Sequence, residues 1–353
     1  TSLILHPLTL PDRPRFARAF ASVESPLAAY AFAPHFVWRA LFSYSWTDID
    51  GHLCLFAEYP DGVYMPLPPL CVTRDALRVT GVSGSVPVTR HSSFDGLSLR
   101  SLDPEALDGR AQPSRTPSPI EGSLVTPFAR DVYAACFAFM RERNTGSAVT
   151  RIENVPEDLA PTLRALGYRV VPNDSDYLYR SRELAALAGD RYKSQRAACN
   201  RFERDSRYRY EPYQDAHREA GLALFEEWAA QKETAGLDAG ARHMLRDSAS
   251  AHREALTHHR ALGLAGHVVW VDEAIRAYTF GYERSSSVFC ILLEVADRRI
   301  PGLAQFLFRE SCREAAGRGF EFINTMDDSG IPSLAQSKRA YHPVRLLPNS
   351  IAT

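Results

Sequence analysis

The sequence lacks the features that mark several common classes of protein. No run of residues approaches the ~18 to 20 apolar positions of a membrane-spanning helix. No charged segment followed by a short apolar one opens the chain, so export is not expected. The formal net charge is −1, so no overall charge excess draws the chain to nucleic acid or to a membrane surface. We therefore expect a cytoplasmic protein that has no transmembrane segment and does not bind DNA.

Its cysteines show no spacing that is typical of a metal site. The six cysteines stand at positions 54, 71, 136, 199, 290 and 312, without a Cys-x-x-Cys pair or a Cys/His cluster. Most occupy apolar segments such as VFCILL, which favours reduced and buried thiols. Walker, Gly-x-Ser-x-Gly and Ser-His-Asp patterns are absent too. We expect no metal and no tightly bound cofactor.

The first half of the chain predicts regular elements around a long insertion. A short strand at 3–10 precedes a helix from about Asp12, and residues 35–42, 47–59 and 62–70 predict a meander of strands. Residues 72–126 are rich in Ser, Pro, Thr and Arg, which is typical of an insertion with little regular structure. This insertion is a candidate lid or partner-binding loop. A helix, a strand, a helix and two strands follow it.

The second half predicts a closely related order of elements. After two helical segments within 181–206, the strand RYRYEPY leads to two helices, three antiparallel strands, a helix, a strand, a helix and a last strand. This order resembles the GNAT acyltransferase fold, and the first half repeats it loosely. We predict an α/β (α+β) fold of two tandem GNAT-like domains, at 1–180 and 181–353. Each is expected to be a mixed, mostly antiparallel sheet flanked by helices.

The segment RRIPGLAQFLFRE at 298–310 connects the third of these strands to a helix. Arg299, Gly302 and Ala304 match the GNAT turn that resembles [Q/R]-x-x-G-x-[G/A], whose backbone N–H groups hold the pyrophosphate of an acyl donor. Pro301 suits the first helical turn, and a helix N-terminus offers oriented donors to an anion. Pro-Gly at a helix start is also a common plain turn. A donor-binding role and a purely structural role both stay open.

Two further stretches carry a more specific resemblance. Residues 189–202 supply Gly189, Tyr192, Arg196, Asn200 and Phe202, and residues 324–343 supply Asn324, Asp328, Gly330, Leu334, Lys338, Tyr341 and Pro343. These positions are similar to G-x-x-Y-x-x-x-R-x-x-x-N-x-F and N-x-x-x-D-x-G-x-x-x-L-x-x-x-K-x-x-Y-x-P. Both patterns belong to a family related to the C-terminal domain of phosphatidylglycerol lysyltransferases. The likeness spans nearly the whole chain except 72–126, although Ser194 and Gln195 stand where the family usually carries basic residues.

The resemblance implies a tandem GNAT fold and a transfer reaction. In characterised relatives, an amino acid moves from aminoacyl-tRNA to a hydroxyl group of a lipid. The expected partners are therefore the acceptor end of an aminoacyl-tRNA, as co-substrate, and a small-molecule or lipid acceptor. The GNAT-like turn also permits an acyl-CoA donor.

Residues 190–207 predict a helix with one basic face. At 100° per residue, Lys193, Arg196 and Asn200 fall within about 80° of Arg204 and Arg207. Residues 190–210 hold seven basic and three acidic residues in a nearly neutral chain. This local excess suits the acceptor end of tRNA, a CoA phosphate or a lipid phosphate, whereas a plain solvated face would look the same.

Aminoacyl transfer needs a base for the acceptor, stabilisation of the carbonyl oxygen and an acid for the leaving group. Asp328 is a candidate base, Lys338 could stabilise negative charge, and Tyr341 could protonate the leaving group, as a Tyr does in many GNAT enzymes. Asn324 and Gly330 are candidate substrate-positioning residues. Alternatively, Asp328 caps the helix after Gly330 and pairs with Lys338.

Glu294 is a further catalytic candidate because it ends an apolar strand. A carboxylate there could be a general base with a raised pKa, or it could be an exposed strand terminus.

Three hypotheses follow from the sequence. The first is an aminoacyltransferase that uses aminoacyl-tRNA by direct attack and without a metal. The second is an acyl-CoA-dependent N-acyltransferase of the same fold. The third is a non-catalytic GNAT-like module that binds a ligand or a partner through residues 72–126.

Overall fold

The computed structural model describes residues 3–72, 127–144, 149–234 and 239–353. The insertion expected at 72–126 therefore lies, except for Val72, outside the described residues. The partner contact expected through it lies there as well.

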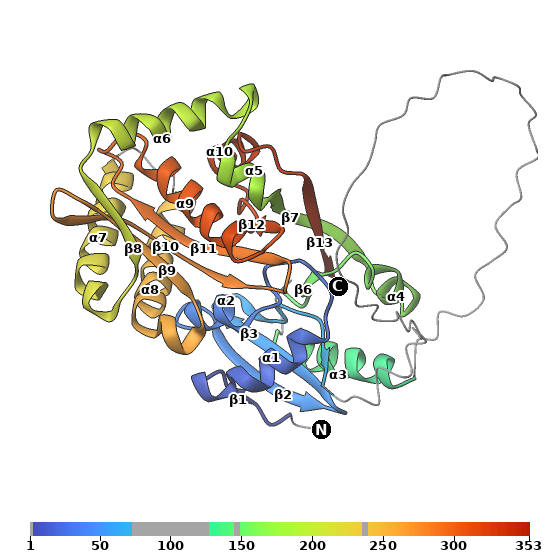
Figure 1. Cartoon of the computed structure of the whole chain (residues 1–353). Coiled ribbons are helices and arrows are strands. Elements are labelled where there is room, and N and C mark those ends of the chain that lie inside the picture. The colour runs from blue at the N-terminus through green and yellow to red at the C-terminus, as the bar shows by residue number, and fades with distance from the viewer. Residues whose placement is uncertain (1–2, 73–126, 145–148, 235–238) are drawn as a thin grey trace, which may run out of the picture.

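In the first half of the chain, short strands form a small sheet and helices lie beside it (Figure 1). In chain order these are β1 (His6–Pro7), α1 (Arg13–Ala21), α2 (Phe32–Val37), β2 (Ser43–Ile49), β3 (His52–Tyr59), β4 (Gly62–Tyr64), β5 (Leu70–Cys71), α3 (Pro127–Arg143), β6 (Ile152–Val155), α4 (Ala160–Ala165) and β7 (Val170–Arg180).

The second half forms longer elements in the predicted order. They are α5 (Ser181–Ala186), α6 (Lys193–Asp205), β8 (Tyr208–Pro212), α7 (Arg218–Thr234), α8 (Ala239–Leu262), β9 (Ala265–Val271), β10 (Ala274–Glu283), β11 (Val288–Ala296), α9 (Leu303–Gly317), β12 (Phe322–Asn324), α10 (Pro332–Arg339) and β13 (Arg345–Ala352).

Local sequence explains the sharp turns between these elements. Asp50 and Gly51 join β2 to β3 with φ of 49° and 74°, and Asp272 and Glu273 join β9 to β10 with φ of 48° and 64°. Two consecutive positive φ values give the hairpin turn whose twist matches that of the flanking strands. Pro332 opens α10 because a proline at the first helical position leaves no N–H unpaired.

Two predictions about strands are wrong. The two strands expected before residue 180 form one continuous strand, β7. Residues 35–42 were expected to begin the meander, but His35 to Val37 complete α2 and a turn follows to Phe42. All six residues of α2 are buried, so its apolar run packs on several sides. A short apolar run of this kind has no periodicity that separates a buried helix from a buried strand.

The two halves exchange their last strands. The larger sheet has the order β6-β13-β7-β12-β11-β10-β9-β8. In it, β7 from the first half lies between β12 and β13 of the second, and β13 lies between β6 and β7 of the first (Figure 1). The domain boundary expected after residue 180 stays a prediction, and the sheet runs across it.

The strand order is symmetric about the β7–β13 pair. On one side, β7 pairs antiparallel with β12, and β12 pairs parallel with β11. On the other side, β13 pairs antiparallel with β6, and Ile152 of β6 forms a parallel bridge to Met65 at the end of β4. Each half therefore builds the same arrangement of a mixed sheet flanked by helices. This confirms the predicted α/β fold with tandem GNAT-like units.

A shared hydrophobic core holds the halves together. One cluster of buried side chains contains Phe16 and Phe36 from the first half together with Leu256, Tyr278 and Phe280 from the second. Burial of aromatic and aliphatic surface on this scale is the main favourable term in folding. The two units are therefore expected to unfold together.

Candidate active site

The strands β11 and β12 separate near the middle of the large sheet. They pair in parallel only from Val288 to Cys290 and from Phe322 to Asn324. Beyond Cys290, the edge of β11 has no strand partner on that side among the described residues. The loop after β12 and helix α10 follow instead, so a site can form at this edge.

A β-bulge in β11 turns Glu294 towards helix α9. Phe280 of β10 pairs with Leu293, whereas the next residue, Gly281, pairs with Ile291, so Leu292 is the extra residue. A bulge changes which face the following side chains occupy. Glu294 consequently shares a cavity with Ala304 of α9.

That cavity has a volume of about 740 Å³ and is bordered by α7, α8, α9 and α10. We call it the helix-flanked cavity. Its walls are largely apolar, and its cationic side chains are Lys232 and Arg298. Lys232 lies over the Trp228 ring, with Nζ 3.9 Å from the ring centroid. An apolar group with an anionic end would suit such a cavity.

Glu294 is the unusual carboxylate of this cavity. Its Oε1 is buried and has no hydrogen-bond partner among the described residues. Burial raises the pKa of Glu294 to about 8, and the charge of Lys338 acts in the opposite direction. A carboxylate with a pKa near neutral pH is suited to proton transfer. The prediction that Glu294 is a general base gains a physical basis here.

Lys338 holds the loop that follows β12. Its Nζ donates to the backbone carbonyl oxygens of Thr325 at 2.5 Å, of Met326 at 3.2 Å and of Asp327. An ammonium group has three N–H donors, so these bonds occupy all of them. Burial lowers the pKa of Lys338, and nearby acidic side chains oppose that shift. The side chain therefore organises the backbone beside Glu294.

A second cavity, the central cavity, lies between the two halves of the chain and has a volume of about 810 Å³. Aromatic rings line it: Trp38, Phe42, Tyr44, Tyr59 and Tyr64. Carboxylates line it too: Asp61, Glu153, Asp174, Asp176, Asp247 and Asp327. Trp38 borders both cavities, and Lys338 borders the central one.

The charge of the central cavity is predominantly negative. The cationic side chains that line it are Arg151 and Lys338. The Nε of Arg151 donates to Glu153 at 2.6 Å. Within the described residues, no group of His, Cys, Asp or Glu is arranged to hold a metal ion. Carboxylates combined with aromatic rings favour an organic cation such as an ammonium group.

Asn324 positions the deepest carboxylate of the central cavity. Its Nδ2 donates to Asp176 at 2.8 Å and to the Pro26 carbonyl at 3.0 Å. Asp176 also accepts from the backbone N–H of Ala28 at 2.7 Å. Burial raises the pKa of Asp176 to about 6, although these bonds oppose the shift. Asn324 is fully buried, and its predicted role in positioning a substrate stays a prediction.

Asp328 does not line either cavity. Its Oδ2 accepts from the Tyr177 hydroxyl at 2.6 Å, and its Oδ1 accepts from the backbone N–H of Gly330 at 3.1 Å. Gly330 has φ of +68° and completes this turn. The capping alternative is wrong: Ile331 is the N-cap of α10 and no side chain caps the helix, while Lys338 binds backbone carbonyls and not Asp328. A direct role of Asp328 stays a prediction. Asp327, next to it in the chain, is the residue that borders the central cavity.

Tyr341 lines neither cavity. Its ring packs edge-on against Phe308 of α9, with 4.7 Å between the ring centroids. Burial raises the pKa of Tyr341, and the charge of Glu294 contributes in the same direction. A role as an acid for the leaving group stays a prediction.

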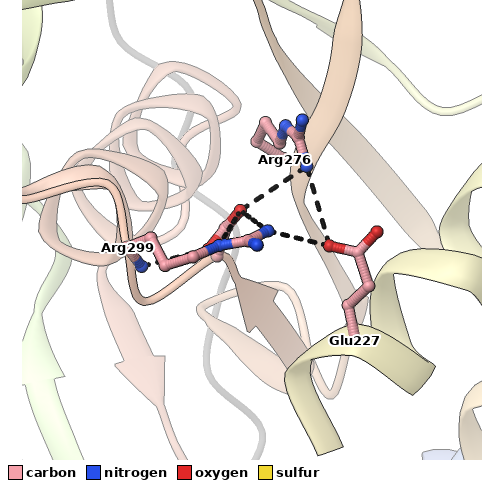
Figure 2. Close-up of polar contacts among 4 residues, drawn as sticks. Glu227, Arg276 and Arg299 are labelled. Atoms are coloured by element: carbon pink, nitrogen blue, oxygen red, sulfur yellow. Dashed lines mark hydrogen bonds and ion pairs between the residues drawn. The ribbon is translucent and has the colours of Figure 1, made fainter. Parts of the chain in front are cut away.

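The turn before α9 uses its arginine in an ion-pair network. The Nη2 of Arg299 lies 2.7 Å from Asp297 and 2.8 Å from Glu227, and Arg276 approaches the same two carboxylates at 3.6 and 3.7 Å (Figure 2). The Asp297 carboxylate raises the pKa of Arg299 further. Arg299 is thus engaged with protein carboxylates, and its predicted contact with a phosphate stays a prediction.

Gly302 and Ala304 take different positions in this turn. Gly302 has φ of +83°, and a Cβ there would lie 2.1 Å from the carbonyl oxygen of Ala198, so α6 lies directly against it. Ala304 faces the helix-flanked cavity. Of Arg299, Gly302 and Ala304, it is Ala304 that borders the helix-flanked cavity.

The predicted basic face of α6 is partly exposed. Lys193 and Asn200 are exposed, whereas Cys199 and Phe202 on the opposite face are buried. Arg196 is turned back, and its Nη1 donates to the carbonyl oxygens of Leu187 at 2.5 Å and Gly189 at 2.9 Å. The structure therefore leaves Lys193 and Asn200 available for a ligand and gives Arg196 a structural contact.

Several residues of the site escaped the sequence reasoning. Asp174 and Asp176 lie on β7, and Trp38 follows α2, far from the C-terminal motifs in the chain. The Asp-Asp pair at 327–328 was a visible signal, but only one of its members was selected. No local pattern predicts that β7 lies between β13 and β12 in the larger sheet, which places its carboxylates at the central cavity.

Comparison with known proteins supports the family resemblance. A family model described as phosphatidylglycerol lysyltransferase, C-terminal, matches residues 122–353. The chain belongs to this family. The resemblance predicted from the motifs at 189–202 and 324–343 is confirmed, and membership places the chain among transferases. No curated protein matches the chain in sequence.

Solved structures share the fold of this family member. A protein of unknown function from Bacteroides thetaiotaomicron is 19% identical with a TM-score of 0.74, and the match covers 99% of each chain. A C-terminal domain assigned to a lysylphosphatidylglycerol synthetase from Agrobacterium fabrum is 12% identical with a TM-score of 0.55, covering 98% of this chain and 92% of that one. L-PGS from Bacillus licheniformis is 12% identical with a TM-score of 0.56, covering 97% and 91%. Among the described residues, no helix is both long and apolar enough to span a membrane.

Proposed function

We propose that this transferase moves an amino acid from aminoacyl-tRNA to a hydroxyl or amine acceptor. The new bond joins the acceptor atom to the aminoacyl carbonyl carbon, and the ester bond to the tRNA ribose breaks. The family supports a transfer reaction. The choice of donor rests on the central cavity.

The observation that carries this choice is the charge of the central cavity. An aminoacyl group brings an amino group, which carboxylates and aromatic rings bind well. Asp176 and Asp327 border that cavity, close to the loop that Lys338 holds. The phosphates of an acyl-CoA would instead lie near Arg299, whose charge is already neutralised by Asp297 and Glu227. The aminoacyl donor is therefore favoured over acyl-CoA.

Glu294 is the proposed general base. Its buried carboxylate, with a pKa of about 8, takes the proton from the acceptor as that atom attacks the carbonyl carbon, and returns it to the departing ribose oxygen. The acceptor enters through the helix-flanked cavity, whose apolar wall accommodates a small molecule or a lipid. Lys338 acts as a positioning residue through the loop carbonyls that it binds.

The acceptor end of tRNA is proposed to lie near α6 and the rim of the helix-flanked cavity. Lys193 and Asn200 are exposed on α6, and Arg298 is exposed beside the cavity. Contacts from such side chains position a nucleic acid through its phosphates without reading its sequence.

The test compares donors by thermal unfolding of the whole chain. A ligand that binds the folded state raises the unfolding temperature. Aminoacylated tRNA should raise it more than the same tRNA after deacylation, whereas acyl-CoA esters should leave it unchanged. Asp327→Asn should reduce the difference between the two tRNA forms, and the exposed Asp272→Asn should not.

The opposite pattern would change the assignment. A shift with acyl-CoA esters alone would establish the acyl-CoA-dependent N-acyltransferase. No shift with either donor would favour the non-catalytic module.

A further inference from the structure

A buried arginine at the hairpin between β10 and β11 lacks an opposite charge. Arg284 is 8% exposed. Its Nη2 donates to the carbonyl oxygen of Val23 at 2.7 Å, and its Nε has no hydrogen-bond partner among the described residues. Removing a guanidinium from water without pairing it is costly. The position therefore favours an anion supplied by a ligand.

The surroundings of Arg284 contain no charged partner within the described part of the chain. Burial lowers the pKa of Arg284, and the groups that oppose this shift are Cys290, Tyr282 and Tyr30. None of these three side chains carries a charge at neutral pH. The guanidinium lies near the Tyr30 ring, with 5.7 Å from Cζ to the ring centroid, which offers weak compensation.

Arg284 borders a cavity of about 410 Å³, which we call the arginine cavity. A second arginine, Arg13, borders it as well. Its Nη1 donates to the carbonyl oxygen of Ala261 at 2.7 Å, at the end of α8. A Cβ on Gly263 would lie 2.2 Å from the Nη2 of Arg13, so the absence of a side chain at Gly263 makes room for this guanidinium.

The carboxylate that borders the arginine cavity is already paired. Glu283 forms an ion pair with Arg318. Among the described residues that line the cavity, two arginines therefore face one carboxylate that has its own partner. The net positive charge excludes a cationic ligand and favours an anionic one.

We propose that the arginine cavity binds a small organic oxyanion, a phosphate or a carboxylate, through Arg284 and Arg13. The planar guanidinium fork matches the oxygen spacing of both groups. Phe20, Phe32 and Leu262 form an apolar wall for the carbon skeleton of the ligand. The cavity volume lies within the range of sites for small molecules.

The arginine cavity is separate from the proposed transfer site. Residues 30–33 border the arginine cavity, whereas Ala28, Ala29, Pro34 and His35 border the central cavity. The peptide groups of Ala28 connect the two sides, because its N–H donates to Asp176 and its carbonyl accepts from Tyr282. The proposal stands on its own, whichever donor the transferase uses.

The test is an anion titration followed by thermal unfolding of the full chain. Inorganic phosphate and acetate are compared with sodium chloride at equal ionic strength and pH. Arg284→Met removes the buried charge and keeps much of the side-chain length, Arg13→Gln weakens the second contact, and the exposed Arg253→Met on α8 is the matched control. Phosphate or acetate should raise the unfolding temperature of the wild type and of Arg253→Met in a saturable way.

The same anion should leave Arg284→Met unchanged and should shift Arg13→Gln less than the wild type. A response to phosphate alone, or to acetate alone, identifies the oxyanion. The proposal is overturned if neither anion gives a saturable shift in the wild type, or if Arg284→Met responds equally. If Arg284→Met fails to fold, isothermal titration calorimetry compares the binding of phosphate or acetate by the wild type and by Arg13→Gln. Equal affinities of the two proteins would then overturn the proposal.

Discussion

A Cβ placed on Gly302 would lie 2.1 Å from the carbonyl oxygen of Ala198, so α9 begins where it touches the backbone of α6. The contact fixes α6 against the turn that precedes α9. Glycine is needed in this turn for two reasons. The backbone has a positive φ of +83°, and there is no space for a Cβ.

Gly302→Ala should therefore be strongly destabilising. The left-handed conformation alone costs about 1 to 2 kcal/mol for alanine. The overlap with a backbone atom forces α6 to move and adds to that cost, so we expect about 3 kcal/mol or more in total. Urea unfolding followed by circular dichroism measures the difference in the free energy of unfolding.

Gly319→Ala at the other end of α9 is the matched control. Gly319 has φ of +92°, but no atom lies within 4 Å of a Cβ built there. This variant should pay only the conformational cost of about 1 to 2 kcal/mol. Equal losses for the two variants would show that the contact with α6 is unimportant.

Glu294 predicts a pH dependence of stability. Its pKa is about 8 in the folded protein, above the usual value for a glutamate, so the folded state holds this proton more tightly than the unfolded state does. The unfolded chain binds fewer protons between about pH 5 and pH 8, and stability falls as the pH rises through this window. Relative to Glu294→Gln, the wild type should lose stability from about pH 5 to pH 8.

Unfolding by urea at several pH values measures this effect. Glu226→Gln, on the exposed side of α7, is the control and should follow the wild type. A constant difference between wild type and Glu294→Gln across the window would contradict the raised pKa. In a transfer assay, Glu294→Gln should also lower the rate by about 100-fold or more, as expected for the loss of a general base.

Lys338 predicts a structural effect on the loop at 325–330. Lys338→Met keeps most of the side-chain length but removes donors to the carbonyl oxygens of Thr325, Met326 and Asp327. Hydrogen bonds from charged groups contribute more than neutral ones, so we expect a loss of about 2 to 4 kcal/mol. Thermal or urea unfolding measures it, with Gln336→Met on the exposed side of α10 as the control. A loss below that of Gln336→Met would refute this role.

Asp328 and Tyr177 predict an energetic coupling. Tyr177→Phe removes their hydrogen bond of 2.6 Å, and Asp328→Asn weakens it because the acceptor loses its charge. If Asp328 acts mainly through this bond, the double variant should be less destabilised than the sum of the single variants by about 1 to 2 kcal/mol. A double-mutant cycle of unfolding free energies measures the coupling.

Tyr179→Phe serves as the reference for that cycle. The Tyr179 hydroxyl donates to the carbonyl oxygen of Lys338 at 2.9 Å and not to Asp328. Its combination with Asp328→Asn should be additive. A transfer rate that falls with Asp328→Asn but not with Tyr177→Phe would instead restore Asp328 as a direct participant.

Much of the secondary structure was predictable because its signals are local. Alternating apolar residues, the Asp-Gly and Asp-Glu turns and Pro332 all act within a few residues of their own positions. The motif at 324–343 likewise located the loop, α10 and Lys338. The short apolar segment at 35–42 carried no such signal, and its helix was missed.

The sequence by itself determined most of the order of elements and the family. Only the tertiary structure decided which side chains form the site. It places Asp327 in the central cavity and turns its neighbour Asp328 to Tyr177, and it brings Arg299 to Glu227, 72 residues away in the chain. It also places β7 between β12 and β13 in the larger sheet. These outcomes depend on packing and hydrogen bonding between distant segments, which no short stretch of sequence specifies.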